Sequence, residues 1–153
     1  MKKFNLVNLI PTFFYVGFLP KMPGTWGSIA AFVVFLIPNT YFFYSIIIFT
    51  IISLLISIPL INKIEGKYGN DPSFVVIDEV LAMWVIFMFD FIANSWILLI
   101  LSFITFRFFD ILKPLYINKL NNRNGAIFVI LDDLIAAIYT ITLMFFLNYF
   151  FKI

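Results

Sequence analysis

Residues Tyr41 to Ile61 read YFFYSIIIFTIISLLISIPLI, an apolar run without a charged side chain. A helix needs roughly 20 consecutive apolar residues to cross the hydrocarbon core of a bilayer. Because lipid offers the backbone no hydrogen-bond partners, a spanning segment has to satisfy its own amides, as a helix does. The run therefore predicts a transmembrane helix in an integral membrane protein.

The rest of the chain follows the same pattern. Of its 153 residues, 63% are hydrophobic and 12% are charged, whereas an ordinary soluble domain is about 45–50% apolar and about 25% charged. Further apolar stretches cover residues 29–37, 74–89, 96–109 and 126–151, after an interfacial arm at 1–26. We expect one domain, residues 1–153, with an all-α fold: a polytopic membrane helical bundle of about four to five membrane-embedded helices.

The stretch from Ile29 to Ile37 is the weakest of these segments. As a helix it would extend only ~14 Å, so we expect it either to be re-entrant or to join a helical stretch in the 20s. Pro38, Asn39 and Thr40 form a turn signal after it. Residues 62–73 and 114–125 are expected to be polar loops.

Charge is distributed unevenly along this topology. Alternating the helices across the membrane puts nine of the ten basic residues on one side: Lys2, Lys3, Lys21, Lys63, Lys67, Arg107, Lys113, Lys119 and Arg123. Seven of the eight acidic residues fall on the same side: Glu65, Asp71, Asp78, Glu79, Asp110, Asp132 and Asp133. The positive-inside rule, which counts Lys and Arg, makes this side cytoplasmic. We therefore expect the active site at the cytoplasmic interface.

Composition also restricts the chemistry. The chain has no cysteine and no histidine, which excludes thiol nucleophiles, zinc–thiolate sites and imidazole bases. A net charge of +2 is too small to indicate a nucleic-acid partner. Carboxylates in the absence of imidazole and thiol ligands suit hard cations such as Mg²⁺ or Mn²⁺.

Two acidic pairs lie inside apolar segments. Asp78-Glu79 comes about one turn into its segment, and Asp132-Asp133 about two turns into the last one. Ionisable groups in such segments are costly and usually face a cavity or a partner. Four carboxylates near one membrane surface would repel one another, and a divalent cation would hold them together. The alternative is that each pair marks only the entry of a helix into the interface.

Arg107, Asp110 and Lys113 are spaced to lie on one helix face. They form either an intrahelical ion pair at a helix end or a phosphate clamp in which Asp110 orients the two bases. Arginine suits forked contacts to phosphate oxygens.

The block PKMPGTWGS, residues 20–28, precedes an apolar helix. Amides and hydroxyls at a helix start can hold an anion. On pattern alone, an ordinary N-cap by Thr25 or Ser28 is the simpler reading.

Four blocks in order resemble the phosphatidylglycerophosphatase A family: PKMPGTWGS (20–28), DPSFVVIDEVLAMW (71–84), FRFFDILKP (106–114) and LDDLIAAIY (131–139). The resemblance implies a multi-pass enzyme of the bacterial cytoplasmic (inner) membrane, whose active site faces the cytoplasm. It also implies the use of Mg²⁺ to hydrolyse phosphatidylglycerophosphate to phosphatidylglycerol and inorganic phosphate.

The resemblance extends to individual positions. The acidic residues that match are Asp71, Asp78, Glu79, Asp110, Asp132 and Asp133, and the other polar matches are Thr25, Ser28, Arg107 and Lys113. The chain departs from the family in the loop at 118–128, which is poor in glycine and lacks the Arg and Asp expected after Lys-Pro. Those changes affect the contacts to the lipid headgroup more than the metal site.

These observations give one working hypothesis and two rivals. Mg²⁺ is held by some of Asp78, Glu79, Asp132 and Asp133, while Asp110 orients the bases. The substrate phosphate is bound by Arg107 and Lys113 with Lys21, Thr25, Ser28 and Asp71. Direct attack by water is favoured over an aspartyl-phosphate intermediate because the DxDx[TV] pattern is absent. The rivals are a phosphatase for another lipid phosphate and a non-enzymatic ion-binding membrane protein.

Overall fold

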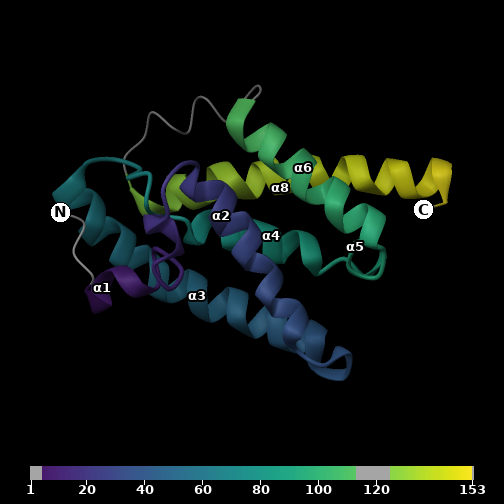
Figure 1. Cartoon of the computed structure of the whole chain (residues 1–153), viewed down its shortest axis with the longest axis horizontal. Helices are drawn as coiled ribbons and strands as arrows, with labels where there is room; N and C mark the ends of the chain where they lie inside the picture. Colours follow the sequence, from purple (N-terminus) through teal and green to yellow (C-terminus); the bar gives the residue numbers. More distant parts are fainter. Residues whose placement is uncertain (1–4, 113–124, 153) are drawn as a thin grey trace.

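The computed structural model describes residues 5–112 and 125–152, and every regular element within these ranges is helical. In chain order the elements are α1 (Leu6–Leu9), η1 (Val16–Phe18), α2 (Pro23–Ala30), η2 (Ala31–Leu36), α3 (Asn39–Tyr68), α4 (Ile77–Phe87), α5 (Asp90–Ala93), α6 (Trp96–Leu112) and α8 (Ala126–Phe151). The all-α prediction is confirmed for the described part of the chain (Figure 1).

Two helices, α3 and α8, are long and apolar enough to cross a membrane. At 1.5 Å per residue, the 30 residues of α3 extend about 45 Å. The 11 residues of α4 fall short of the roughly 20 needed to span, and the 17 described residues of α6 are at the lower end of that range. The described residues thus contain two candidate spans, with shorter apolar helices packed beside them, and the expected four to five membrane-embedded helices are not confirmed.

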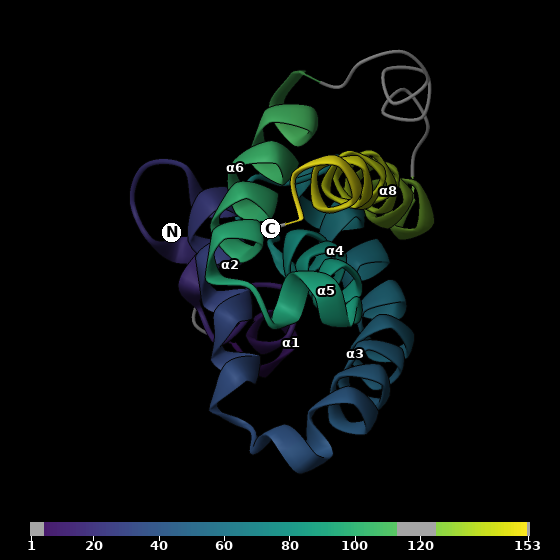
Figure 2. The same ribbon diagram turned by 90° about the vertical axis from the view of Figure 1, so that its right-hand side faces the viewer.

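Helix α4 is the centre of the bundle. Figure 2 shows α2, α3, α6 and α8 arranged around it, and α4 packs most closely against α8. Its side chains are buried on nearly every face, from Ile77 to Phe87. The Nε1 of Trp84 donates a hydrogen bond of 3.0 Å to the carbonyl of Ala31, which ties α4 to the junction of α2 and η2.

The start of α4 is held by the N-terminal arm. The backbone amides of Val76 and Ile77 both donate to the carbonyl of Pro11, at 2.9 and 3.2 Å. Gly17 and Gly27 lie so close to Phe74 and Val76 that a Cβ at either glycine would collide with them. This close packing fixes the first turn of α4, which carries the first acidic pair.

Several predicted boundaries were wrong. Residues 62–68, expected to be a loop, continue α3, which ends at Gly69 with φ of 92°. Lysine has a high helix propensity, so Lys63 and Lys67 allow the helix to continue beyond the point where the apolar run stops. The segment at 74–89 becomes helical only at Ile77. Residues 29–37 take the second predicted form, since α2 runs directly into η2 and the helical stretch extends from Pro23 to Leu36.

Candidate active site

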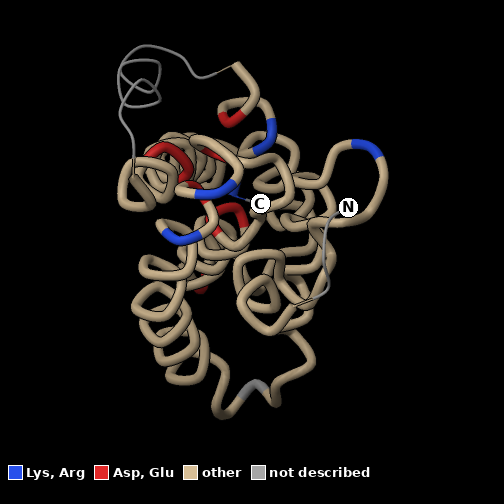
Figure 3. The backbone as a smooth tube through the Cα atoms, turned by 90° about the vertical axis from the view of Figure 1, so that its left-hand side faces the viewer, with Lys and Arg blue, Asp and Glu red and all other residues tan. Residues whose placement is uncertain are grey.

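The charged residues gather at one end of the bundle. Figure 3 shows most of the acidic and basic segments in the upper part of that view, which leaves the lower part nearly free of charge. The start of α4, the early part of α8, the end of α6 and the start of α2 meet there around a cavity of about 390 Å³. Its lining is Met22, Pro23, Gly24, Asp71, Ser73, Val75, Asp78, Glu79, Arg107, Asp110, Ile111, Val129, Asp132 and Asp133.

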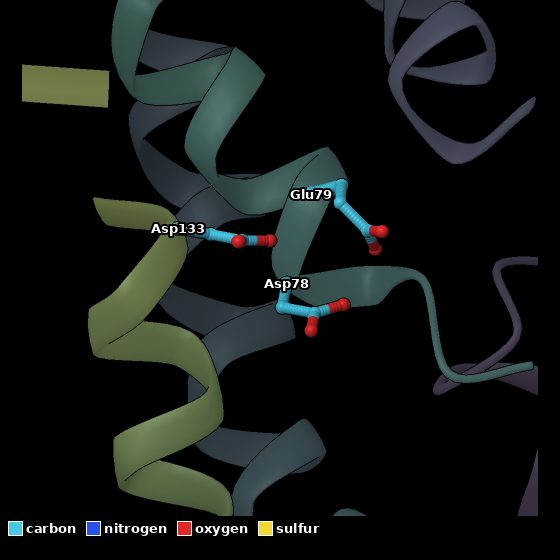
Figure 4. Close-up of side chains that lie close together, drawn as sticks. All are labelled: Asp78, Glu79 and Asp133. Atoms are coloured by element: carbon cyan, nitrogen blue, oxygen red, sulfur yellow. The ribbon is translucent and has the colours of Figure 1, made fainter. Parts of the chain in front are cut away.

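Three carboxylates converge in this cavity. One oxygen from each of Asp78, Glu79 and Asp133 lies within 4.8 Å of the other two, and Figure 4 shows them facing the same space from α4 and α8. Asp132 also lines the cavity, but it is not part of this close set. Of the four predicted metal ligands, the structure thus brings three together and leaves the fourth beside them.

The carboxylates are well shielded from solvent. Asp78 and Asp133 are each 5% exposed and Asp132 is 3% exposed, so these residues are more than markers of a helix entering the interface. Helix α4 lies outside both candidate spans. Burial, with the Glu79 charge as a smaller cause, raises the pKa of Asp78 well above its usual range. Burial and then the Asp133 charge raise the pKa of Glu79 to about 8.

This donor set fits a divalent cation. The buried Asp78 Oδ1 and Glu79 Oε2 atoms have no hydrogen-bond partner among the described residues. Buried polar atoms without partners are costly and call for an explanation, an ion being one. Oxygen-only carboxylate ligands suit Mg²⁺, which is commonly held by one or two carboxylates together with water and substrate phosphate.

Arg107 joins the carboxylates to the rest of the site. Its Nη1 lies 2.7 Å from Asp110 Oδ2 and 3.8 Å from Glu79 Oε1. The same nitrogen donates to Ser28 Oγ at 3.4 Å. The buried Nε of Arg107 has no partner in the described part of the chain. The predicted ion pair with Asp110 is therefore present, and it holds Arg107 where both residues line the cavity.

The start of α2 closes one side of the cavity. Pro23 occupies the first turn, Met22 is the N-cap residue, and no side chain caps the helix. The expected N-cap by Thr25 or Ser28 was wrong, because both residues lie inside the helix. Ser28 Oγ instead donates to the carbonyl of Gly24 at 2.9 Å and accepts from Arg107.

Gly24 is a site residue that sequence reasoning missed. A Cβ at this position would overlap Glu79 Oε1 and would lie 3.2 Å from Arg107 Nη1. The only sequence signal was the Pro-Gly pair itself, and that pair predicts a helix start equally well. The contact with α4 and α6 depends on tertiary packing.

Of the remaining predicted site residues, some line the cavity and others do not. Asp71 lines the cavity, with φ of 45° and its amide donating to Glu65 Oε1 at 3.0 Å. Lys21 is exposed and does not line the cavity, although its neighbour Met22 does. Thr25 is also absent from the lining. Lys113 lies outside the described residues.

Carboxylates gathered beside an arginine, at the charged end of an apolar helical bundle, are the groups that a membrane-associated enzyme acting on phosphate esters would need. The sequence matches the family described as PgpA, phosphatidylglycerophosphatase A, over residues 9–148. The chain belongs to this family, and it is a phosphatase.

Similar curated proteins agree on this class. Phosphatidylglycerophosphatase A of Haemophilus influenzae is 33% identical, with 97% of this chain and 94% of the relative covered. The protein of the same name from Escherichia coli is 27% identical, with 97% and 87% covered. A Bacteroides thetaiotaomicron protein named "Putative phosphatidylinositol-3-phosphatase" is 34% identical, with 89% of each chain covered. No solved structure matches this chain.

Proposed function

We propose that this protein hydrolyses the terminal phosphate of phosphatidylglycerophosphate in a Mg²⁺-dependent reaction, yielding phosphatidylglycerol and inorganic phosphate. The convergence of Asp78, Glu79 and Asp133 beside Arg107 carries the proposal. Membership of the phosphatidylglycerophosphatase A family supports the substrate.

Asp78, Glu79 and Asp133 would hold the metal, with Asp132 at the edge of the cavity as a further oxygen ligand or a partner for bound water. When bound, Mg²⁺ supplies charge neutralisation at the phosphate and lowers the pKa of a coordinated water. The carboxylates would keep this charge beside side chains that are themselves buried, where electrostatic interactions are stronger than in water.

Arg107 would bind the phosphate. Its Nε is a buried donor without a partner among described residues, and a guanidinium matches the geometry of phosphate oxygens. Asp110 and Ser28 hold the other end of the guanidinium through Nη1. Charge on the equatorial oxygens grows as the phosphoryl group is transferred, so a fixed arginine stabilises that state without reorganising.

The reaction would take place at the cytoplasmic surface of the bacterial inner membrane. The charged end of the bundle supports this side, since it contains Lys63, Lys67 and Arg107 together with the acidic cavity. A lipid headgroup would reach the cavity at the membrane surface while its acyl chains remain in the bilayer.

The first test is phosphate release from phosphatidylglycerophosphate in detergent micelles. We expect release with Mg²⁺, no release with EDTA, and loss of at least 100-fold in kcat for Asp133→Asn. Asp90→Asn is the matched control, because Asp90 is exposed in α5, away from the cavity lining. No release from folded, monodisperse wild type, with or without metal, would overturn the proposal.

A second substrate has one specific observation in its favour, the name of the Bacteroides relative. Phosphatidylinositol 3-phosphate is also a phosphate monoester on a lipid headgroup, so the same residues could cleave it. Competition between the two lipids in mixed micelles decides the matter. A higher kcat/KM for the phosphoinositide would transfer the proposal to that substrate.

A further inference from the structure

A second, chemically different region lies between the N-terminal arm and α3. It contains two cavities, one of about 380 Å³ and one of about 130 Å³. The N-terminal arm and α3 contribute to both. Neither cavity shares a described residue with the catalytic cavity.

The larger cavity is almost wholly apolar. Phe49, Ile52 and Ile56 of α3 line it together with Ile10 and Phe13 of the arm, and residues of η2 and α4 complete the wall. These three α3 side chains are 45%, 49% and 40% exposed, and they belong to a helix long and apolar enough to span a bilayer. The cavity therefore opens on a surface that hydrocarbon would cover.

The smaller cavity differs in having charged and amide side chains in its lining. Lys63 and Lys67 line it from α3, and Asn5 and Asn8 line it from the arm. Its described lining includes no acidic side chain. Glu65, on the same turn of α3, is engaged by the amide of Asp71 at 3.0 Å and lies outside the lining. Val7, Ile64 and Tyr68 complete the lining, and Lys67 Nζ lies 5.5 Å from the centroid of the Tyr68 ring. The two lysines thus line this pocket without a carboxylate among its described lining residues.

The two cavities lie on one stripe of α3. Phe49, Ile56 and Lys63 are seven residues apart, and each step of seven returns to within about 20° of the same helix face. Lys63 lies about 10 Å beyond Ile56 along the axis. The apolar cavity and, about 10 Å further along α3, the pocket lined by the two lysines together form what we call the lipid groove. Their order along the helix matches the order of acyl chain and phosphate in a phospholipid.

We propose that this groove binds an anionic glycerophospholipid of the surrounding bilayer, separately from the substrate in the catalytic cavity. Its phosphate lies between Lys63 and Lys67, and one acyl chain occupies the apolar cavity between the arm and α3. The site does not depend on which phosphate ester the enzyme cleaves. Because the Pro11 carbonyl of the arm accepts the hydrogen bonds that fix the start of α4, the bound lipid would brace the turn that carries Asp78.

The test is lipid binding by the full chain in detergent, measured by native mass spectrometry. The probes are phosphatidylglycerol and phosphatidylcholine with identical acyl chains. We expect wild type to prefer the anionic lipid, and Lys63→Gln with Lys67→Gln to weaken its binding roughly tenfold, since each lysine attracts an anionic lipid surface independently. Lys152→Gln, at the exposed end of α8, is the control: it removes one lysine charge outside both cavities and should bind as wild type does.

Two further variants locate the lipid. Arg107→Gln changes the catalytic cavity and should leave this binding intact. Ser53→Trp fills the apolar cavity and should weaken binding of both lipids, while inorganic phosphate at millimolar concentration should not displace them. Equal binding of the two lipids by wild type, loss of binding with Arg107→Gln, or unchanged binding in the lysine double variant would each overturn the proposal.

Discussion

Arg107 reaches three partners through a single nitrogen, Nη1: Asp110, Glu79 and Ser28. The 2.7 Å contact with Asp110 is the shortest of the three, so Asp110 sets the position of the guanidinium. Nε has no hydrogen-bond partner among the described residues, so the proposed mechanism assigns it to the substrate phosphate. A lysine in place of Arg107 would keep the positive charge but not this arrangement, because its side chain has a single nitrogen where the guanidinium has several in one plane.

Arg107→Lys should therefore lower kcat/KM by roughly 100-fold, the effect of losing about 2–3 kcal/mol of charged hydrogen bonding. The measurement is steady-state phosphate release in mixed micelles. The thermal unfolding midpoint should change little, because the positive charge is kept beside Asp110 and Glu79. A variant as active as wild type would show that charge without the forked geometry is sufficient.

Gly24 allows the close approach of α2 to the Glu79 carboxylate. Gly24→Ala should reduce activity at least tenfold, because the new Cβ would displace Glu79 Oε1 and crowd Arg107. Gly66→Ala is the matched control, since a Cβ there meets nothing within 4 Å and the position is helical. Parallel activity and thermal unfolding assays check both variants, and equal activity in the two would contradict this role for Gly24.

At the scale of elements, the position of α8 depends on a partner from another helix. The amide of Ala126, the first residue of α8, donates to Asn62 Oδ1 at 2.9 Å. Gly125 is the N-cap residue and supplies no side chain for this purpose. Asn62 of α3 thus acts as a cap from across the bundle, two turns before Asp132 and Asp133.

Asn62→Ala should destabilise the protein by about 1 kcal/mol, the typical cost of losing a helix cap. Chemical or thermal unfolding in detergent measures this change. Asn62→Asp retains the oxygen acceptor and should restore most of the lost stability. If both variants unfolded like wild type, the hydrogen bond would have no part in holding α8.

At the scale of the whole molecule, the charged end and the opposite end of the bundle should lie on different sides of the membrane. The natural chain has no cysteine, so single cysteines report topology without background. Gly66→Cys lies near the end of α3 at the charged end, and Asn94→Cys lies in the exposed turn between α5 and α6.

A membrane-impermeant maleimide should label Gly66→Cys in inverted membrane vesicles and Asn94→Cys in right-side-out vesicles. The reason is the bias of Lys and Arg toward the cytoplasmic side. Labelling both positions from one side would contradict the topology, and labelling in the reverse pattern would contradict the cytoplasmic active site.

The sequence alone predicted the helical class, because apolar runs such as Tyr41–Ile61 leave the backbone only one way to satisfy its amides in lipid. It also predicted that acidic residues such as Asp78 and Asp133 gather at one site, since carboxylates are too costly to place in apolar segments without a partner. Spacing placed Arg107 and Asp110 on one face, because neighbours three residues apart on a helix meet whatever surrounds them.

Only the tertiary structure decided which carboxylates meet, that α2 closes the cavity at Gly24, and that Asn62 caps α8. Asp78 and Asp133 are 55 residues apart in the chain, and no local rule relates their directions. Adjacent helical residues point about 100° apart, so the choice between Asp132 and Asp133 depends on how α8 is rotated against α4. That rotation results from side-chain packing across the whole bundle, which a linear pattern does not contain.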